Sequence, residues 1–188
     1  MDALVPAFII AALAEIGDAT QLLAILLGAR FRKPAAVLAG IAVAALINMG
    51  LGAAAGAAIA ATINHRAIGL MTGLSLILAG GGAALRVKAP DPIDTWRLGA
   101  FASSAGAFFI LALFDKTQFV AATIAAGSGH PLLTAIGAAA GITVANAPAV
   151  VLADRWPKLV PLRALRLGAG GLLVLAGIVM AVRALGLV

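Results

Sequence analysis

Long apolar runs, separated by short polar stretches, make up most of this chain. Five of six such runs contain no Lys or Arg, and the fourth contains only Lys116. The runs cover residues 3–29, 34–64, 67–85, 98–129, 131–153 and 167–182. A membrane-spanning helix needs roughly 17–25 apolar residues, and continuous apolar runs favour helices over the alternating strands of a membrane barrel. The pattern therefore predicts an all-α membrane protein with six transmembrane helices.

The composition agrees with this class and excludes others. Of the 188 residues, 63% are hydrophobic and 11% are charged, against about 45–50% and about 25% in a typical soluble domain. A chain of this length cannot bury so much apolar surface in one aqueous core, so the composition excludes soluble globular and disordered proteins. The sequence has no cysteine, which excludes disulfides, zinc ribbons and thiol nucleophiles. We expect the lipid bilayer to surround this chain.

The basic residues predict how the chain crosses the bilayer. Of the 13 Lys and Arg, ten lie in the loops that follow the first, third and fifth runs, whereas Arg66 and Arg183 lie on the opposite side. Cytoplasmic loops carry the excess of Lys and Arg, so both termini are expected outside the cytoplasm. The formal net charge of +6 is then a topology signal, and we expect no nucleic-acid partner. The composition and short loops favour a bacterial inner membrane.

An internal repeat divides the chain into two halves. The segment Asp18-Ala19-Thr20-Gln21 recurs 97 positions later as Asp115-Lys116-Thr117-Gln118, and Pro34 and Gly40 meet Pro131 and Gly137 at the same offset. We therefore expect one three-helix repeat at residues 1–85, a cytoplasmic linker at 86–97 and a second three-helix repeat at 98–188. A repeat with an odd number of helices inserts its second copy upside down. The predicted architecture is two inverted three-helix repeats, as in many secondary transporters.

Three carboxylates inside the apolar runs mark a candidate functional site. Glu15, Asp18 and Asp115 each cost about 2.5–3.5 kcal/mol at the centre of a spanning helix, and the repeat predicts that they converge near the bilayer midplane. Glu15 and Asp18 are three residues apart, so we expect both to project from one face of the first helix, and we expect Lys116 to be turned about 100° away from Asp115. Carboxylate and amide oxygens suit hard cations such as calcium, magnesium and manganese.

The segment Glu15-Ile16-Gly17-Asp18-Ala19-Thr20 resembles the Glu-x-Gly-Asp-(Lys/Arg)-(Thr/Ser) signature of the GDT family of membrane cation exchangers. The segment 146–150 also resembles this family. The resemblance implies six helices, one motif on each of helices one and four, and export of manganese or calcium in exchange for protons. The second motif has Ala112 in place of Glu and Phe114 in place of Gly, and Ala19 stands where the first motif has a basic residue. The loss of one acid and one base leaves the net site charge at −2, which one divalent cation or two protons neutralise.

We therefore predict a secondary transporter that exports Mn²⁺ or Ca²⁺ in exchange for protons, with no cofactor and no enzymatic activity. The expected metal ligands are Glu15, Asp18, Asp115, Gln21 and Gln118. The expected supporting residues are Thr20, Lys116, Thr117, Asn48 and Asn146. The two asparagines either form interhelical hydrogen bonds or line the ion path, and Lys116 either holds Asp115 ionised or stands in for the ion.

Two other functions fit the same pattern. One is an exporter of amino acids or other small cations, and the other is an accessory membrane subunit that transports nothing. An intramembrane enzyme is disfavoured because the sequence contains no HExxH motif and no nucleophile elbow. The sequence leaves the oligomeric state open.

Overall fold

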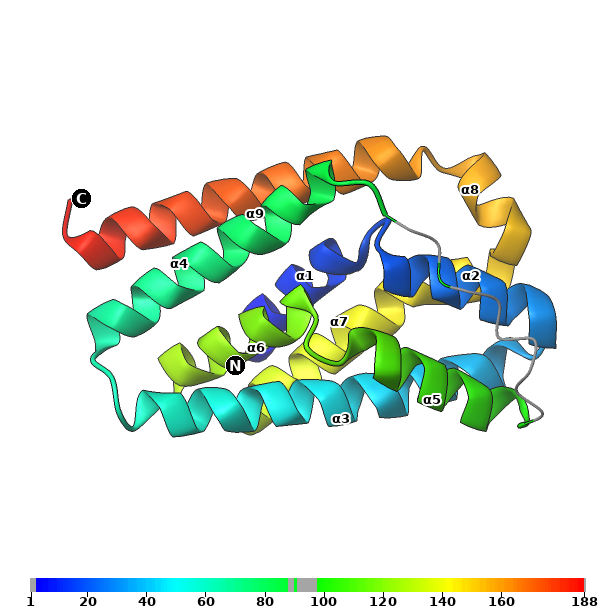
Figure 1. Ribbon diagram of the computed structural model, residues 1–188, viewed down its shortest axis with the longest axis horizontal. Coiled ribbons are helices and arrows are strands. Elements are labelled where there is room, and N and C mark those ends of the chain that lie inside the picture. The colour runs from blue at the N-terminus through cyan, green and yellow to red at the C-terminus, as the bar shows by residue number, and fades with distance from the viewer. Residues whose placement is uncertain (1–2, 88–89, 91–97, 188) are drawn as a thin grey trace.

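The computed structural model describes residues 3–87, 90 and 98–187, and within these residues the chain forms helices and no strands. The helices are α1 (Leu4–Glu15), α2 (Ala19–Phe31), α3 (Pro34–Ala60), α4 (His65–Gly81), η1 (Gly82–Ala84), α5 (Ala100–Ala112), α6 (Lys116–Ser128), α7 (Pro131–Leu152), η2 (Ala153–Arg155), α8 (Trp156–Leu159) and α9 (Leu162–Leu185). Most of them run along the long axis of the molecule (Figure 1). Of the linker expected at 86–97, only residues 86, 87 and 90 lie among the described residues.

The described helices give four to six candidate membrane spans. Four are long and apolar enough to cross a bilayer singly: α3, α4 with η1, α7 with η2 and α8, and α9. The other two candidates are the pairs α1–α2 and α5–α6, each bent by 74° at a short break. The expected all-helical class is therefore confirmed. The expectation that residues 3–29 and 98–129 each form one continuous helix is wrong, because each run breaks near its middle.

Local sequence signals explain several helix ends. Pro34 and Pro131 stand at the first position of α3 and α7, where a missing N–H costs nothing and the fixed φ suits the helix. The side chain of Asn64 accepts the backbone N–H of Ala67 at the start of α4. Gly129, with φ of 68°, ends α6 in the left-handed conformation that glycine adopts without strain. The last run is longer than predicted, because α9 begins at Leu162 rather than near 167.

The repeat extends over the whole fold. The helices α2, α3 and α4 begin 97 positions before α6, α7 and α9, respectively. The packing is also reciprocal, since α1 packs on α7 of the second half, while α5 of the second half packs on α3 of the first. Reciprocal contacts of this kind are those that a two-fold relation between two similar units produces.

The contact between α4 and α9 repeats this reciprocity at single residues. A Cβ built on Gly73 would lie 2.7 Å from the carbonyl oxygen of Gly177, and one built on Gly170 would lie 2.7 Å from that of Gly80. The pairs Gly73–Gly177 and Gly170–Gly80 are equivalent at the offset of 97. Small residues of this kind let membrane helices approach backbone to backbone, so α4 and α9 lie side by side along one edge of the molecule (Figure 1).

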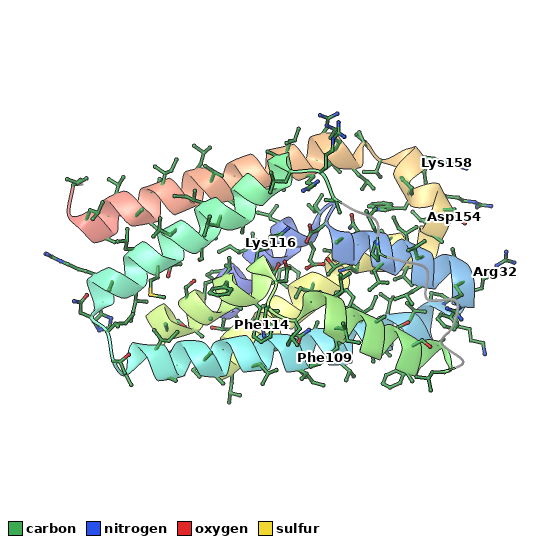
Figure 2. The ribbon with its side chains drawn as sticks, in the orientation of Figure 1. Arg32, Phe109, Phe114, Lys116, Asp154 and Lys158 are labelled. Atoms are coloured by element: carbon green, nitrogen blue, oxygen red, sulfur yellow. The ribbon has the colours of Figure 1, made fainter. Side chains whose placement is uncertain are left out.

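The outward faces of these helices are apolar, and the charges gather at the ends. Leu46, Leu51, Leu172 and Leu175 are each about half exposed or more, as lipid-facing side chains are. The connection from α2 to α3, the start of α5 and the helix α8 lie at one end of the molecule (Figure 1). We call this the basic end, because Arg32 and Lys158 project from it (Figure 2).

Candidate functional site

The first helix break separates Glu15 from Asp18. Glu15 is the last residue of α1, Gly17 has φ of 69°, and Asp18 is the N-cap of α2. Glycine adopts this left-handed conformation without steric cost. The prediction that Glu15 and Asp18 share one face of a continuous helix is therefore wrong, because the backbone turns between them. The two carboxylates instead flank the break from the end of one helix and the start of the next.

The second break has the same geometry with a less suitable residue. Phe114 stands where the first half has Gly17, and its φ is 61°. Asp115 is the N-cap of α6, as Asp18 is of α2. A bulky side chain in the left-handed region costs about 1–2 kcal/mol, so the surrounding contacts must impose this conformation. One such contact comes from Gln118.

Two glutamines brace the breaks by an exchange between the halves. The Gly17 N–H donates to Oε1 of Gln21 (2.9 Å), and the Nε2 of Gln21 donates to the Ala145 carbonyl (2.9 Å) in α7. Equivalently, the Phe114 N–H donates to Oε1 of Gln118 (2.7 Å), and the Nε2 of Gln118 donates to the Asn48 carbonyl (2.9 Å) in α3. Because each Oε1 keeps a second lone pair, the expectation that these amides also bind a cation stays a prediction.

Glu15 is enclosed in a polar pocket. Its side chain is 1% exposed, and its Oε2 accepts hydrogen bonds from the Thr20 hydroxyl (2.6 Å) and from Nδ2 of Asn146 (3.0 Å). Thr20 lies beyond the break and Asn146 lies in α7, so Glu15 joins both halves of the chain. Asn146 thus makes one of the interhelical hydrogen bonds that the sequence suggested, and Asn48 makes another, from its Nδ2 to the Phe109 carbonyl (3.2 Å) in α5.

Lys116 pairs with the carboxylate of the opposite half. Its Nζ lies 2.9 Å from Oδ2 of Asp18, and it is placed near the middle of the molecule (Figure 2). The expectation that Lys116 turns away from the site is therefore wrong, because the break at residues 113–115 redirects the start of α6. Glu15 lies within electrostatic range of both Asp18 and Asp115. The three carboxylates thus occupy one region.

Several buried oxygen atoms in this region have no hydrogen-bond partner within the described part of the chain. They are Oδ1 of Asn48, Oδ1 of Asn146, Oδ2 of Asp115 and Oγ1 of Thr117. Buried polar atoms are nearly always paired, so unpaired ones need an explanation. The described residues include no group of three or more His, Cys, Asp or Glu side chains arranged to hold a metal ion. The carboxylates are therefore near one another without forming a closed metal cage.

The repeat also shows what the second half has lost. At the offset of 97, the positions equivalent to Glu15 and Asn146 are Ala112 and Met49. Both are buried, with 4% and 1% of their surface exposed. The acid and its amide partner are thus replaced together by two apolar residues, which avoids an unpaired buried polar group. The polar pocket around Glu15 therefore has no equivalent at the second break.

Sequence reasoning missed both breaks, although the sequence contains a signal for the first one. A glycine followed by Asp and Thr within an apolar run is the pattern of a helix end followed by an N-cap. The second break has no such glycine and could be inferred only from the repeat. Sequence reasoning also missed the contact of Arg166 with the first break.

Comparisons with known proteins point to one family. A model of the family described as "Divalent cation/proton antiporter GDT1" matches the chain twice, over residues 3–90 and 100–187. A protein of Vibrio cholerae serotype O1 named "Putative manganese exporter" is 33% identical over 165 residues, which cover 87% of this chain and 82% of that protein. No solved structure matches the chain significantly. The two matched segments start 97 positions apart, as the repeated helices do.

Proposed function

Because the chain belongs to the divalent cation/proton antiporter GDT1 family, we propose that it exports a divalent cation, Mn²⁺ or Ca²⁺, in exchange for protons. The observation that carries this proposal is the gathering of three carboxylates at two helix breaks, together with buried oxygen atoms of Asn48, Asn146 and Thr117 that have no partner in the described residues. Hard divalent cations take such oxygen ligands. A function in transport also fits a family of antiporters rather than enzymes.

We place six crossings in the membrane, with the halves 1–85 and 98–188 inverted relative to each other. Each bent pair then counts as one span, and each half contributes three. The excess of Lys and Arg at the basic end assigns that end to the cytoplasm by the positive-inside rule, which leaves both termini on the other side. The bacterial relative supports a bacterial inner membrane.

The proposed ligands are Glu15, Asp18 and Asp115, with the amides of Gln21 and Gln118 and the free Oδ1 atoms of Asn48 and Asn146 completing the shell. Broken helices suit this task, because half-helices direct their C-terminal carbonyls at bound cations and their N-termini at anionic groups. The end of α1 at Glu15 is such a C-terminus, and the starts of α2 and α6 carry the carboxylates of Asp18 and Asp115. Thr20 and Thr117 support the shell.

Lys116 then acts as a resident cation. Without a metal ion, its ammonium neutralises Asp18. A divalent cation from the cytoplasm displaces Lys116 and joins the three carboxylates, the two halves rock about the site, and the ion leaves on the far side. Protons then neutralise the carboxylates, which lets the site return without the metal. Because Lys116 comes from the opposite half, its release couples ion binding to relative movement of the halves.

The manganese exporter named among the relatives makes Mn²⁺ the first cation to test. The purified protein is reconstituted in liposomes, and flux is measured for Mn²⁺, Ca²⁺ and Mg²⁺ with a proton-sensitive dye inside. We expect Asp18→Asn to reduce metal-driven proton movement to background. Asp154→Asn is the matched control, because Asp154 is an exposed carboxylate at the basic end, and it should leave the flux unchanged.

Three outcomes would overturn the proposal. Flux that is equal in wild type and Asp18→Asn would show that the site is misassigned. A wild-type protein that moves no divalent cation but moves a cationic amino acid would establish the other transporter function, and one that moves nothing would favour an accessory subunit.

A further inference from the structure

We propose that Arg166, in the second turn of α9, is the gate that closes the path from the basic end to the ion site. This inference rests on the proposed transport function, since a gate has meaning only where an ion passes. Four observations carry it: the contact of Arg166 with the first break, the way its guanidinium is held, the two cavities that it lines, and the residues that replace it in the other half.

The stem of Arg166 lies directly on the break between Glu15 and Asp18. A Cβ built on Gly17 would lie 3.0 Å from Cβ of Arg166 and 3.1 Å from its Cδ. This leaves no room for another side chain at Gly17, so the glycine meets two requirements at once. It adopts φ of 69°, and it admits the aliphatic part of Arg166 against the backbone. The gate thus closes on the one segment that carries both acidic ligands of the first half.

The guanidinium is held by one hydrogen bond. Its NH2 atom donates to the Gly82 carbonyl (2.7 Å) at the end of α4, and its Nε is buried without a hydrogen-bond partner in the described residues. A buried N–H without a partner is unfavourable, because it has lost its hydrogen bonds to water. The closed position is therefore an imperfect one, which the side chain can leave without breaking an extended network.

Arg166 lines two cavities. One, which we call the small cavity, has a volume of about 10 Å³ and is also lined by Ile16 and Lys116. The other, which we call the open cavity, has a volume of about 460 Å³ and is also lined by Arg86 and Arg163. The small cavity touches the residue that pairs with Asp18, and the open cavity is lined by basic residues. In the proposed path, an ion moves from the open cavity past Arg166 to Asp18.

The charge of Arg166 suits a gate for cations. A guanidinium across the path repels a divalent cation while it is in place. Lys116 neutralises Asp18 at the same time, so two resident cations close the site when no metal is bound. Displacement of Lys116 and Arg166 would then be two linked parts of the same opening.

The other half lacks this device. At the offset of 97, Gly17 and Arg166 correspond to Phe114 and Gly69, so the large and small residues are exchanged between the break and its partner helix. Phe114 is 79% exposed rather than covered. Within the described residues, the arginine gate therefore exists at the first break and not at the second.

Cysteine labelling tests this gate without any transported ion, because the native chain has no cysteine. Ile16→Cys places a thiol at the small cavity, and Ala84→Cys places one at the open cavity as an exposed control. Sealed membrane vesicles of both orientations are treated with a charged, membrane-impermeant methanethiosulfonate. We expect the thiol at position 16 to react about tenfold more slowly than the one at position 84, as buried sites protected by local closure do.

Removal of the Arg166 side chain should change only the rate at which the thiol at position 16 reacts. Arg166→Ala should raise the reaction rate at position 16 about tenfold, towards that of an open site, in vesicles that expose the basic end. Arg166→Lys keeps a long stem and a donor for Gly82 and should leave the rate slow. Arg163→Ala is the matched control, because Arg163 lines the open cavity but is not the residue against Gly17.

Three results would overturn the gate: an unchanged rate in Arg166→Ala, an equal rise in Arg163→Ala, or a rise confined to vesicles of the opposite orientation. If Arg166→Ala does not fold, Arg166→Gln is compared with Arg166→Lys, and equal rates refute the gate. The labelling and flux experiments fail independently. If the protein transports no metal but Arg166→Ala still raises the labelling rate, the gate is supported and the proposed function is refuted. If metal flux is normal but Arg166→Ala leaves the labelling rate unchanged, the proposed function is supported and the gate is refuted.

Discussion

The contact between α3 and α6 provides a quantitative test of the packing around the second break. A Cβ built on Gly56 would lie 1.9 Å from the carbonyl oxygen of Ala122, whereas ordinary contacts begin at 3.4 Å. Gly56→Ala must therefore push α6 away by about 1.5 Å, and overpacking of this kind costs about 1–3 kcal/mol. Because the obstacle is backbone, which cannot rotate aside, we expect a loss near the upper limit. Gly50 lies on the same helix with nothing within 4 Å, so Gly50→Ala should cost nothing.

The two variants are compared by thermal unfolding of the purified protein in detergent. For a chain of this size, about 3 kcal/mol corresponds to a fall in Tm of about 6–12 °C. Gly56→Ala should also lower metal-driven flux, because α6 carries Asp115 at its first turn. If Gly56→Ala unfolds at the same temperature as Gly50→Ala, α3 and α6 do not meet as closely as described, and the placement of the second break loses its support.

Four further substitutions test the site itself. Gln21→Leu and Gln118→Leu should each destabilise the protein by about 2 kcal/mol in a denaturant titration, since each removes two hydrogen bonds and leaves a backbone N–H unpaired; a loss in only one of them would contradict the exchange between the halves. Lys116→Gln should tighten Mn²⁺ binding in calorimetry by about tenfold or more, because the ion no longer displaces a paired ammonium; weaker binding would contradict its role as a resident cation. Asn146→Leu should raise the KM for metal about tenfold or more, since hydrogen bonds to a charged group contribute about 1.5–3 kcal/mol; an unchanged KM would exclude Asn146 from the site of Glu15.

The sequence predicted the fold class and the repeat correctly because both depend on patterns that every residue of a span contributes to. Apolar runs long enough to cross a bilayer follow from its thickness, and an offset of 97 is visible in four-residue segments. Helix boundaries were less accurate. The start of α9 at Leu162 lies among Arg163 and Arg166, whose charges made that segment look like a loop.

The local geometry of the candidate site could not be predicted from the same patterns. A period of 3.6 residues places Glu15 and Asp18 on one face only while the helix continues, and one glycine in the left-handed region cancels that argument. The pairing of Lys116 with Asp18 depends on contact between residues 98 positions apart. The loss of Glu at position 112 was visible in the sequence. Its physical explanation needed the hydrogen bond from Asn146 to Glu15, which only the structure shows and which Met49 cannot make in the other half.

The crossed glutamine bonds mean that neither half of this chain is a self-sufficient folding unit. Within the described residues, the Nε2 of Gln21 donates to a carbonyl of α7, and the Nε2 of Gln118 donates to one of α3. An isolated half would leave its own amide and its partner's carbonyl without the bond that braces the turn. This mutual completion across the interior therefore contributes to the cohesion between the halves.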